Sequence, residues 1–525
     1  MKRRDFLQYA TSSFFLPLVL DGYGAKAETN ASSPFMKALL ELAEINDKIL
    51  VVIQLNGGND GLNMVLPLDQ YSTYTASNFR ANIAIPESKV LKLKNLPQTG
   101  LHPSMTGLQT LFNEGKLSIV HSTGYPNPSF SHFRANDIWY TAVDSSKIST
   151  SGWLGRYLEK SYESFPSGYP NAHFPDPLAI QISSISSTTF NTSSIPGALA
   201  IQNPDTFSKI VGDKPVINPG ELPNTPAGKY TAYIREQQTS SVAYAGQLKA
   251  AADKGKNLVT YPAGNPLADQ LKIVSRLIAG GLQTKIYYVT LGGFDTHSQQ
   301  VDATDTTKGT HANLLKYLSD GIKVFMDDLK ANGKVDKVAG MTFSEFGRRA
   351  ISNGSKGTDH GWASPLFVFG SGIKTQVIGK NPNLSDLDGN NIKIQNDFRQ
   401  VYASVLTDWL GASDSIVKSI LFDKTFTNLP VFRETILGVE SISPDLINIY
   451  PNPAQAELIM ESDMMMQGRD RLTIIDIQGR VSPMKITYLS NSKILINTSE
   501  LPAGKYFIRL ENDKHSVVKP VMILR

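Results

Sequence analysis

The stretch Ile286-Tyr287-Tyr288-Val289-Thr290-Leu291, followed by Gly293-Phe294-Asp295-Thr296-His297, decides the expected fold and the expected site together. Its first part is an apolar run, which predicts a buried strand. Its second part places a carboxylate and an imidazole two residues apart, on the same side of an extended chain. Asp295 and His297 are therefore a natural pair of ligands for one metal ion. Strand ends are also where open α/β sheets build their binding sites.

Strand-like and helix-like periods alternate along the chain from Lys48 to about Leu410. Strands are predicted at Ile49–Leu55, Leu117–His121, Asp176–Ile182, Ile286–Leu291, Val335–Phe343 and Leu366–Gly370. Helices are predicted at Ser104–Leu117, Ser131–Tyr140, Leu267–Ala279, His311–Leu329 and Phe398–Leu410. This alternation predicts an α/β fold with a doubly wound, mostly parallel sheet, over residues 45–440. The segment 183–229 is rich in Ser, Thr, Asn and Pro, and we interpret it as an insertion over the sheet edge.

Three further acidic or imidazole side chains follow or precede predicted strands. Asp60 stands in a Gly-rich turn after the first strand, and Glu345 follows the Val335 strand directly. His360 precedes the Leu366 strand, which we expect to run antiparallel to its neighbour and so to begin at the same sheet edge. Each residue has a plainer interpretation: a turn acid, a surface pair of Glu345 with Arg348, and a solvated histidine. Their shared edge favours a common site.

A helix start supplies the remaining candidates. Ser131 heads the helix after Phe130, where free N–H groups and partial positive charge favour an anion or a hydroxyl that loses its proton. The plainer interpretation is an ordinary N-cap serine. His132 and Arg134 are adjacent candidates for contact with a substrate anion. His311 is a further candidate of lower rank.

Two metal ions about 3.5–4 Å apart can clamp the attacking and leaving oxygens of a displacement at phosphorus. Such a site needs carboxylates and imidazoles from several strand ends. The predicted ligands are Asp60, Asp295, His297, Glu345 and His360, which hold one or two divalent ions, with Ser131 as the nucleophile or as a residue that orients water. The residue types do not distinguish zinc, calcium or magnesium. The motif G-x-S-x-G of conventional serine hydrolases is absent.

Composition narrows the class of protein. The 525 residues are 41% hydrophobic and 19% charged, with a formal net charge of +4, which gives no reason to expect a nucleic-acid partner. There are no cysteines, which excludes disulfides and thiolate metal sites. Residues 1–27, with Lys2-Arg3-Arg4-Asp5-Phe6-Leu7 and the apolar stretch Phe14–Leu20, read as a twin-arginine signal peptide. We expect no transmembrane segment in the mature chain.

The character of the sequence changes near residue 440. Residues 441–525 are predicted to form a small all-β sandwich, with short alternating strands between turn residues. The predicted strands are Asn448–Tyr450, Glu457–Glu461, Arg471–Asp476, Lys493–Asn497, Tyr506–Glu511 and Val517–Leu524.

Three motifs of this module resemble the type A sorting domain of type IX secretion. They are Ile449-Tyr450-Pro451-Asn452-Pro453-Ala454, Ile475-Asp476-Ile477-Gln478-Gly479-Arg480 and Leu501-Pro502-Ala503-Gly504-Lys505-Tyr506. The resemblance implies that the type IX machinery exports the protein across a bacterial outer membrane, so that it is secreted or held at the cell surface. The alternative is a plain β-sandwich used for binding.

The large domain resembles the "domain of unknown function 1501" family over roughly residues 45–410. Its signature motifs are found here as Leu55–Asn63, Ser131-His132-Phe133, Gly293–His297, Ser344–Arg348 and Asp359-His360-Gly361. The family is considered a distant relative of the alkaline phosphatase and sulfatase superfamily, so the resemblance implies an alkaline phosphatase-like sheet with a divalent-metal site. By that pattern Asp60 matches a metal Asp and Ser131 the nucleophile. The sulfatase signature is absent around Ser131, which argues against a true sulfatase.

We therefore expect a secreted, metal-dependent hydrolase of phosphate or related esters, acting on a small ester or glycan substrate. The alternative is a non-catalytic secreted or cell-surface binding protein that retains the hydrolase fold.

Overall fold

The computed structural model describes residues 47–211, 225–433, 447–462, 471–476, 481–482, 484–490, 492–511 and 516–525. The predicted signal peptide, residues 1–27, lies outside the described residues. The chain divides into a large unit, Asn46–Arg433, and a smaller one that contains the C-terminal strands. The boundary predicted near residue 440 also falls outside the described residues. Among the residues that are described, no helix is both long and apolar enough to cross a membrane.

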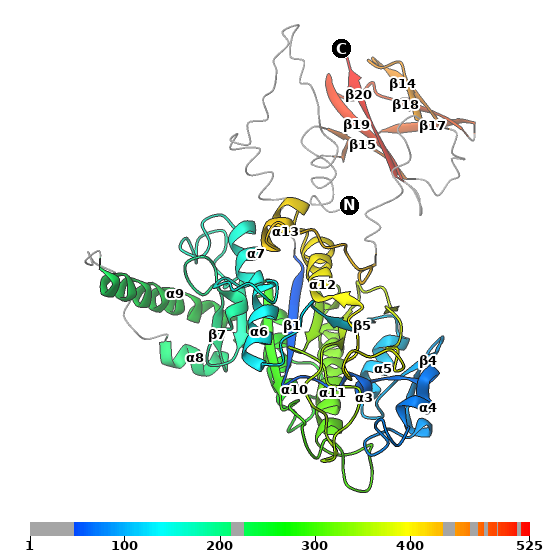
Figure 1. The fold of residues 1–525 in the computed structure, drawn as a ribbon. Helices are drawn as coiled ribbons and strands as arrows, with labels where there is room; N and C mark the ends of the chain where they lie inside the picture. The colour runs from blue at the N-terminus through cyan, green and yellow to red at the C-terminus, as the bar shows by residue number, and fades with distance from the viewer. Residues whose placement is uncertain are drawn as a thin grey trace. The chain divides into compact units, whose positions relative to one another are not determined.

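A nine-stranded sheet forms the centre of the large unit (Figure 1). Its order is β11-β5-β10-β9-β1-β8-β6-β7, and β12 pairs with β5. Every pairing is parallel except the two that β10 makes, with β5 and with β9. This confirms the predicted mostly parallel α/β sheet. The strands are β1 Ile49–Asn56, β5 Leu117–Gly124, β6 Ala179–Ile182, β7 Leu199–Ile201, β8 Ile286–Gly292, β9 Val338–Phe343, β10 Ser364–Gly370, β11 Val377–Ile378 and β12 Asn396–Asp397.

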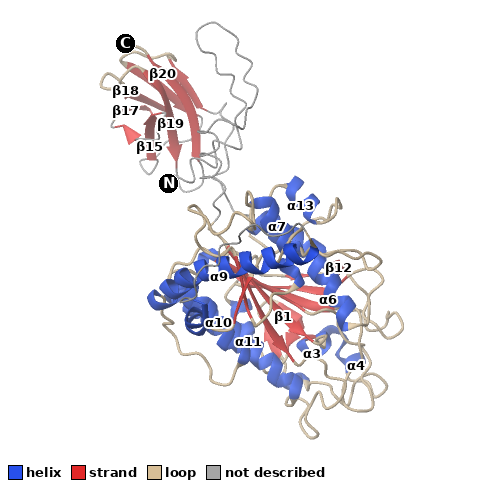
Figure 2. Ribbon diagram, turned by 90° about the vertical axis from the view of Figure 1, so that its left-hand side faces the viewer, coloured by secondary structure: helices blue, strands red, loops and turns tan. Residues whose placement is uncertain are grey.

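Helices cover both faces of this sheet, because successive side chains of a strand point to opposite faces. In β1, Val51 and Ile53 belong to one buried cluster, together with residues of α5, α10 and α11. Leu50 and Val52 belong to a second cluster, with residues of α6, α7 and α12. Figure 2 shows the strands between these helices. The helices are α3 Gly61–Met64, α4 Tyr71–Tyr74, α5 Thr106–Asn113, α6 His132–Thr141, α7 Trp153–Ser161, α8 Pro204–Val211, α9 Pro226–Lys254, α10 Pro266–Ala279, α11 Thr310–Ala331, α12 Phe398–Ser404 and α13 Asp414–Ile420.

The segment predicted as an insertion, 183–229, holds regular structure in its described part. β7 extends the sheet beside β6, and α8 follows it. The long helix α9 begins at the end of the segment and was not predicted. A small antiparallel sheet of order β2-β4-β3 follows β1 in the chain. Its strands are β2 Val65–Pro67, β3 Leu91–Leu93 and β4 Leu96–Leu101.

The C-terminal module consists of two four-stranded antiparallel sheets. Their orders are β13-β14-β18-β17 and β16-β15-β19-β20. Apolar residues of both sheets, such as Leu458 of β14 and Ile508 of β19, form one buried cluster, as in a sandwich. The all-β character predicted from the sequence is confirmed. The strands are β13 Ile447–Tyr450, β14 Glu457–Ser462, β15 Arg471–Asp476, β16 Val481–Ser482, β17 Lys485–Ser490, β18 Lys493–Asn497, β19 Gly504–Glu511 and β20 Ser516–Ile523.

One buried carboxylate fastens α11 to α10 and to the loop before α10. Asp328 is fully buried and accepts hydrogen bonds from Leu258 N at 2.7 Å, Ser275 Oγ at 2.7 Å and Tyr261 Oη at 3.0 Å. We expect Asp328→Asn to lower the free energy of unfolding by about 2–4 kcal/mol, because the amide N–H₂ would face these donors. Asp327→Asn removes only a partly exposed pair with Lys323 and is expected to cost about 0.5 kcal/mol or less. Denaturant unfolding of both variants checks this, and equal losses would contradict it.

Candidate metal centre

The site lies at one edge of the sheet, where β1, β8 and β9 end and antiparallel β10 begins. Helix α3 follows β1 at this edge (Figure 1). Gly57 has a φ of 125°, and a Cβ there would lie 2.4 Å from the Asp295 backbone nitrogen. The glycine pair after β1 therefore lets the loops that follow β1 and β8 approach closely.

Asp295 and His297 lie together beyond the end of β8, as their spacing predicts. The His297 Nε2 atom is 3.1 Å from Asp295 Oδ1. Both side chains remain nearly half exposed, at 45% for His297 and 48% for Asp295. The pair is therefore accessible to a ligand from solvent.

The connection from β9 to β10 brings His360 to the same pair. Within this connection, Arg348 and His360 form an isolated antiparallel β-bridge. His360 Nε2 lies 2.9 Å from His297 Nε2 and 3.2 Å from Asp295 Oδ1. Burial lowers the pKa of His360, which favours the neutral imidazole that a metal ion requires. The expectation that β10 runs antiparallel to its neighbour is thus correct, and it explains how His360 reaches the pair.

His132, which the sequence placed at a substrate anion, is a member of this cluster. It is the first residue of α6, and its Nε2 atom lies 3.5 Å from Asp295 Oδ2. Donor atoms of His132, Asp295 and His360 all lie within 4.8 Å of one another. Four residues, His132, Asp295, His297 and His360, therefore converge; we call them the histidine cluster.

All three imidazoles share one arrangement, with Nε2 toward Asp295 and Nδ1 against an oxygen atom. Nδ1 of His132 lies 2.8 Å from Glu345 Oε1. Nδ1 of His360 lies 2.8 Å from the Phe130 carbonyl oxygen, and Nδ1 of His297 lies 3.3 Å from Asp359 Oδ1. Metal-ligating histidines usually donate their second N–H to a carboxylate or a carbonyl in this way. Ligands in a tetrahedral zinc site lie roughly 3.3 Å apart, given bonds of ~2.0 Å. The distances from the three Nε2 atoms to the Asp295 carboxylate, 3.5, 3.1 and 3.2 Å for His132, His297 and His360, are close to this value.

Glu345 is a buried residue that contacts the cluster through His132. Its side chain is fully buried, and Oε1 accepts a hydrogen bond of 2.9 Å from Gly57 N in addition to the contact with His132. The carboxylate thus orients an imidazole. It does not pair with Arg348, the plainer interpretation considered from the sequence.

Arg348 joins the loops that carry the cluster. Its guanidinium is buried and donates to the carbonyl oxygens of Gly57, Gly58 (2.6 Å), Thr358 (2.8 Å) and Phe294 (3.1 Å). It also donates to Asp295 Oδ1 at 2.6 Å. Sequence reasoning missed this role, because nothing in a local motif tells which carbonyls a guanidinium will reach.

The same contacts keep Asp295 ionised. Burial alone would raise the pKa of Asp295, but the hydrogen bond and the charge of Arg348 oppose it, and the pKa falls to about 2. The carboxylate is therefore charged across the physiological range and is available to a cation.

Asp60 does not join the cluster. It is buried, and both of its oxygens contact Arg80 Nη1, at 3.0 and 3.1 Å. Gln300 Nε2 donates to Oδ2 at 2.6 Å. Burial opposes ionisation, but the charge of Arg80 outweighs it and keeps the pKa of Asp60 below its usual value. Because a guanidinium already satisfies this carboxylate, we leave Asp60 out of the proposed metal site.

The remaining candidates lie around the cluster or away from it. Ser131 is the exposed N-cap of α6, without a side-chain cap bond. It lies between Phe130, whose carbonyl contacts His360, and His132 of the cluster. Arg134 donates to the carbonyls of Ser145 and Lys147. The buried His311 contacts Asn59 Oδ1 at 3.0 Å, and burial lowers its pKa to about 4. Arg134 and His311 are therefore engaged in other contacts.

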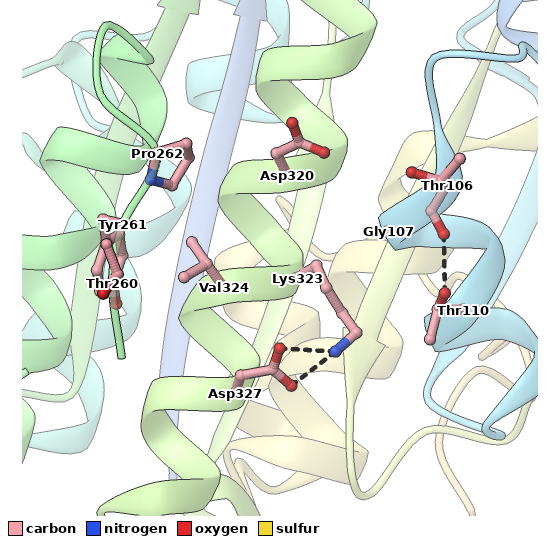
Figure 3. A pocket seen from close by; sticks show the side chains of 10 residues that line it. All are labelled: Thr106, Gly107, Thr110, Thr260, Tyr261, Pro262, Asp320, Lys323, Val324 and Asp327. Atoms are coloured by element: carbon pink, nitrogen blue, oxygen red, sulfur yellow. Dashed lines mark hydrogen bonds and ion pairs between the residues drawn. The ribbon is translucent and has the colours of Figure 1, made fainter. Parts of the chain in front are cut away.

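A separate, open surface pocket of about 460 Å³ lies between α5, α11 and the loop before α10 (Figure 3). Its charged side chains are already paired, Lys323 with Asp327 and Asp320 with Lys316. None of its lining residues belongs to the histidine cluster. They are Thr106, Gly107, Thr110, Thr260, Tyr261, Pro262, Asp320, Lys323, Val324 and Asp327.

Comparison with solved structures finds remote similarity. A protein in the alkaline phosphatase superfamily from Vibrio parahaemolyticus matches with a TM-score of 0.32 and 11% identity, over 85% of this chain and 81% of that chain. The lipoteichoic acid synthase LtaP from Listeria monocytogenes matches with a TM-score of 0.31 and 10% identity, over 84% of this chain and 87% of that chain. The PsFucS1 sulfatase from Pseudoalteromonas sp. matches with a TM-score of 0.30 and 11% identity, over 89% and 85%. We carry no residue role over from these remote matches.

Comparison with protein families covers two segments of the chain. Residues 230–408 match the family described as "Protein of unknown function (DUF1501)", and residues 448–524 match the secretion system C-terminal sorting domain. No curated protein matches. The sorting-domain resemblance is confirmed over residues 448–524, and the DUF1501 resemblance is confirmed over residues 230–408, which contain three of the five motifs. The chain thus carries a DUF1501 region in its large unit and a C-terminal sorting domain, which indicates export by type IX secretion to the outside or the surface of the cell.

Proposed function

We propose that this exported protein is a metal-dependent hydrolase of phosphate or related esters, with a divalent ion held by the histidine cluster. The observation that carries the proposal is the shared orientation of His132, His297 and His360, each with Nε2 toward Asp295 and Nδ1 against an oxygen. Three imidazoles and one carboxylate favour zinc or a similar transition metal over calcium and magnesium, which prefer oxygen ligands. A single cluster supports one ion.

When bound, such an ion supplies electrophilic polarisation of an ester oxygen. The chain's own residues fix the ligands around it. Glu345, Asp359 and the Phe130 carbonyl hold the three rings, and Arg348 holds the carboxylate of Asp295. This preorganisation lowers the entropic cost of binding both ion and substrate.

Ser131 is the proposed nucleophile. Its hydroxyl stands at the N-terminus of α6, where helix N–H groups favour a developing negative charge. In this proposal Oγ attacks phosphorus, the bond from phosphorus to the leaving alcohol breaks, and the serine proton ends on that alcohol. Water then releases phosphate and restores the serine. The alternative role for Ser131 is to orient the water that attacks directly.

One observation favours the rival function, a non-catalytic binding protein. Asp295 and His297 are nearly half exposed, whereas catalytic sites usually exclude water around the reacting groups. A binding protein would keep the metal and show no turnover.

Metal content tests the proposed ligands. We expect about one divalent ion per wild-type chain. We expect none in Asp295→Ala or His360→Ala, because each change removes one ligand of the ion and so weakens metal binding. His173→Ala is the matched control, since His173 is exposed on a loop outside the cluster. Elemental analysis of purified protein measures this. A metal-free wild type, or full metal in both variants, contradicts the site.

Turnover tests the proposed nucleophile. With an aryl phosphate as substrate, Ser131→Ala is expected to lower kcat by about 100-fold or more while metal content stays unchanged. Ser413→Ala is the control, because Ser413 also caps a helix, α13, without belonging to the site. Unchanged kcat in Ser131→Ala would favour water as the attacking group. Absence of turnover on aryl phosphates, sulfates and carboxylates by metal-loaded wild type would favour the binding protein.

We expect Arg348 to increase the affinity for the metal ion without contacting the ion itself. Lysine cannot reach the several acceptors that the guanidinium bonds, so Arg348→Lys should weaken metal binding by roughly 10–100-fold. Arg134→Lys is the control, since Arg134 also binds backbone carbonyls but is engaged away from the cluster. Competition with a metal chelator measures both affinities. Equal affinities in wild type and Arg348→Lys would refute this role.

A further inference from the structure

We propose that Phe130 and Phe133 form an apolar platform beside the histidine cluster, which binds the aryl or alkyl group of an anionic ester. This inference rests on the proposed function, because the cluster must hold the charged group of the same ligand. It adds the substrate class: an ester in which the anionic group is joined to an apolar group.

The first support is exposure. Phe133 is 88% exposed and Phe130 is 42% exposed. A phenyl ring in water gains nothing from the hydrophobic effect, and burying it is worth roughly 1.5–3 kcal/mol. Two such rings within four residues are a candidate contact surface for a ligand.

The second support is position. The Phe130 carbonyl accepts the hydrogen bond from His360 Nδ1, and Phe133 follows His132 directly in α6. Phe130 therefore contacts the cluster through its backbone, and Phe133 is the neighbour in sequence of a cluster member. Buried Phe346 packs against the same imidazoles, with ring centroids 4.9 Å from His132 and 4.5 Å from His360.

A third exposed apolar residue is tied to the same helix. Arg134 of α6 holds the carbonyls of Ser145 and Lys147, and Ile148, the next residue, is 85% exposed. Arg134, which the sequence assigned to a substrate anion, thus fastens the loop that carries this side chain. The surroundings of α6 thus place ligand-type polar atoms near exposed apolar side chains, and an organic anion can use contacts of both kinds.

Binding of two phosphonates tests the platform without any need for turnover, because the C–P bond resists hydrolysis. We expect the full-length, metal-containing chain to bind phenylphosphonate roughly tenfold or more tightly than methylphosphonate in calorimetry. Phe133→Ser should lose most of this preference while its affinity for methylphosphonate stays unchanged, and Phe130→Ser should lose much of the preference as well. Leu258→Ser, which removes another exposed apolar side chain of the large unit, should keep it.

Unfolding midpoints and metal content of each variant show that only the surface has changed. Equal binding of the two phosphonates by wild type, or an unchanged preference in the double variant Phe130→Ser/Phe133→Ser, overturns the platform alone. If neither phosphonate binds, the anion site and the platform both fall. If the preference holds but no ester is hydrolysed, the hydrolase proposal fails and the platform stands.

Discussion

The buried guanidinium of Arg348 is the interaction on which the geometry of the site depends. It donates to carbonyl oxygens after β1 and β8, to one in the loop before β10, and to the carboxylate of Asp295. A buried charge of this kind is costly unless hydrogen bonds satisfy it, so the loops must meet around it. Gly57 and Gly58 permit the approach, because a side chain at either position would overlap its neighbours. The histidines then stand on loops that have little freedom to separate.

Part of this site could be predicted from the sequence. The spacing of Asp295 and His297 after an apolar run placed them side by side. His360 was expected at the same edge because one strand ends there and the next, antiparallel strand begins there. These predictions worked because strand periodicity and sheet polarity are set by the local pattern. The alternating strands of the C-terminal module were predictable for the same reason.

Other parts depend on partners that lie far away in the chain. Asp60 has the residue type and the position of a ligand, but Arg80 occupies its carboxylate. Glu345 follows its strand as predicted, but its side chain is fully buried, where it contacts the His132 imidazole. The direction of His132 depends on how α6 docks onto the sheet, which no local motif encodes. The helix α9 was not predicted, and only its first residues lie in the segment 183–229 that was interpreted as an insertion.

The amino-acid composition of the chain and its export from the cell both agree with the proposed metal centre. The chain has no cysteine, so among strong ligands for a transition metal only histidines and carboxylates are available. The sorting domain directs the protein out of the cell, where a site open to solvent can meet its substrate. Four side chains on two loops and one helix start thus account for the chemistry we propose, and the sheet serves to bring them together.

X-ray absorption at the edge of the bound metal tests the central claim most directly. The account predicts a first shell of about three imidazole nitrogens and one carboxylate oxygen at ~2.0–2.1 Å. His132→Ala, loaded with excess metal to offset its weaker binding, should show one imidazole fewer in that shell, whereas His173→Ala should leave it unchanged. A shell made of oxygens alone, or a spectrum that does not change in His132→Ala, would contradict the account.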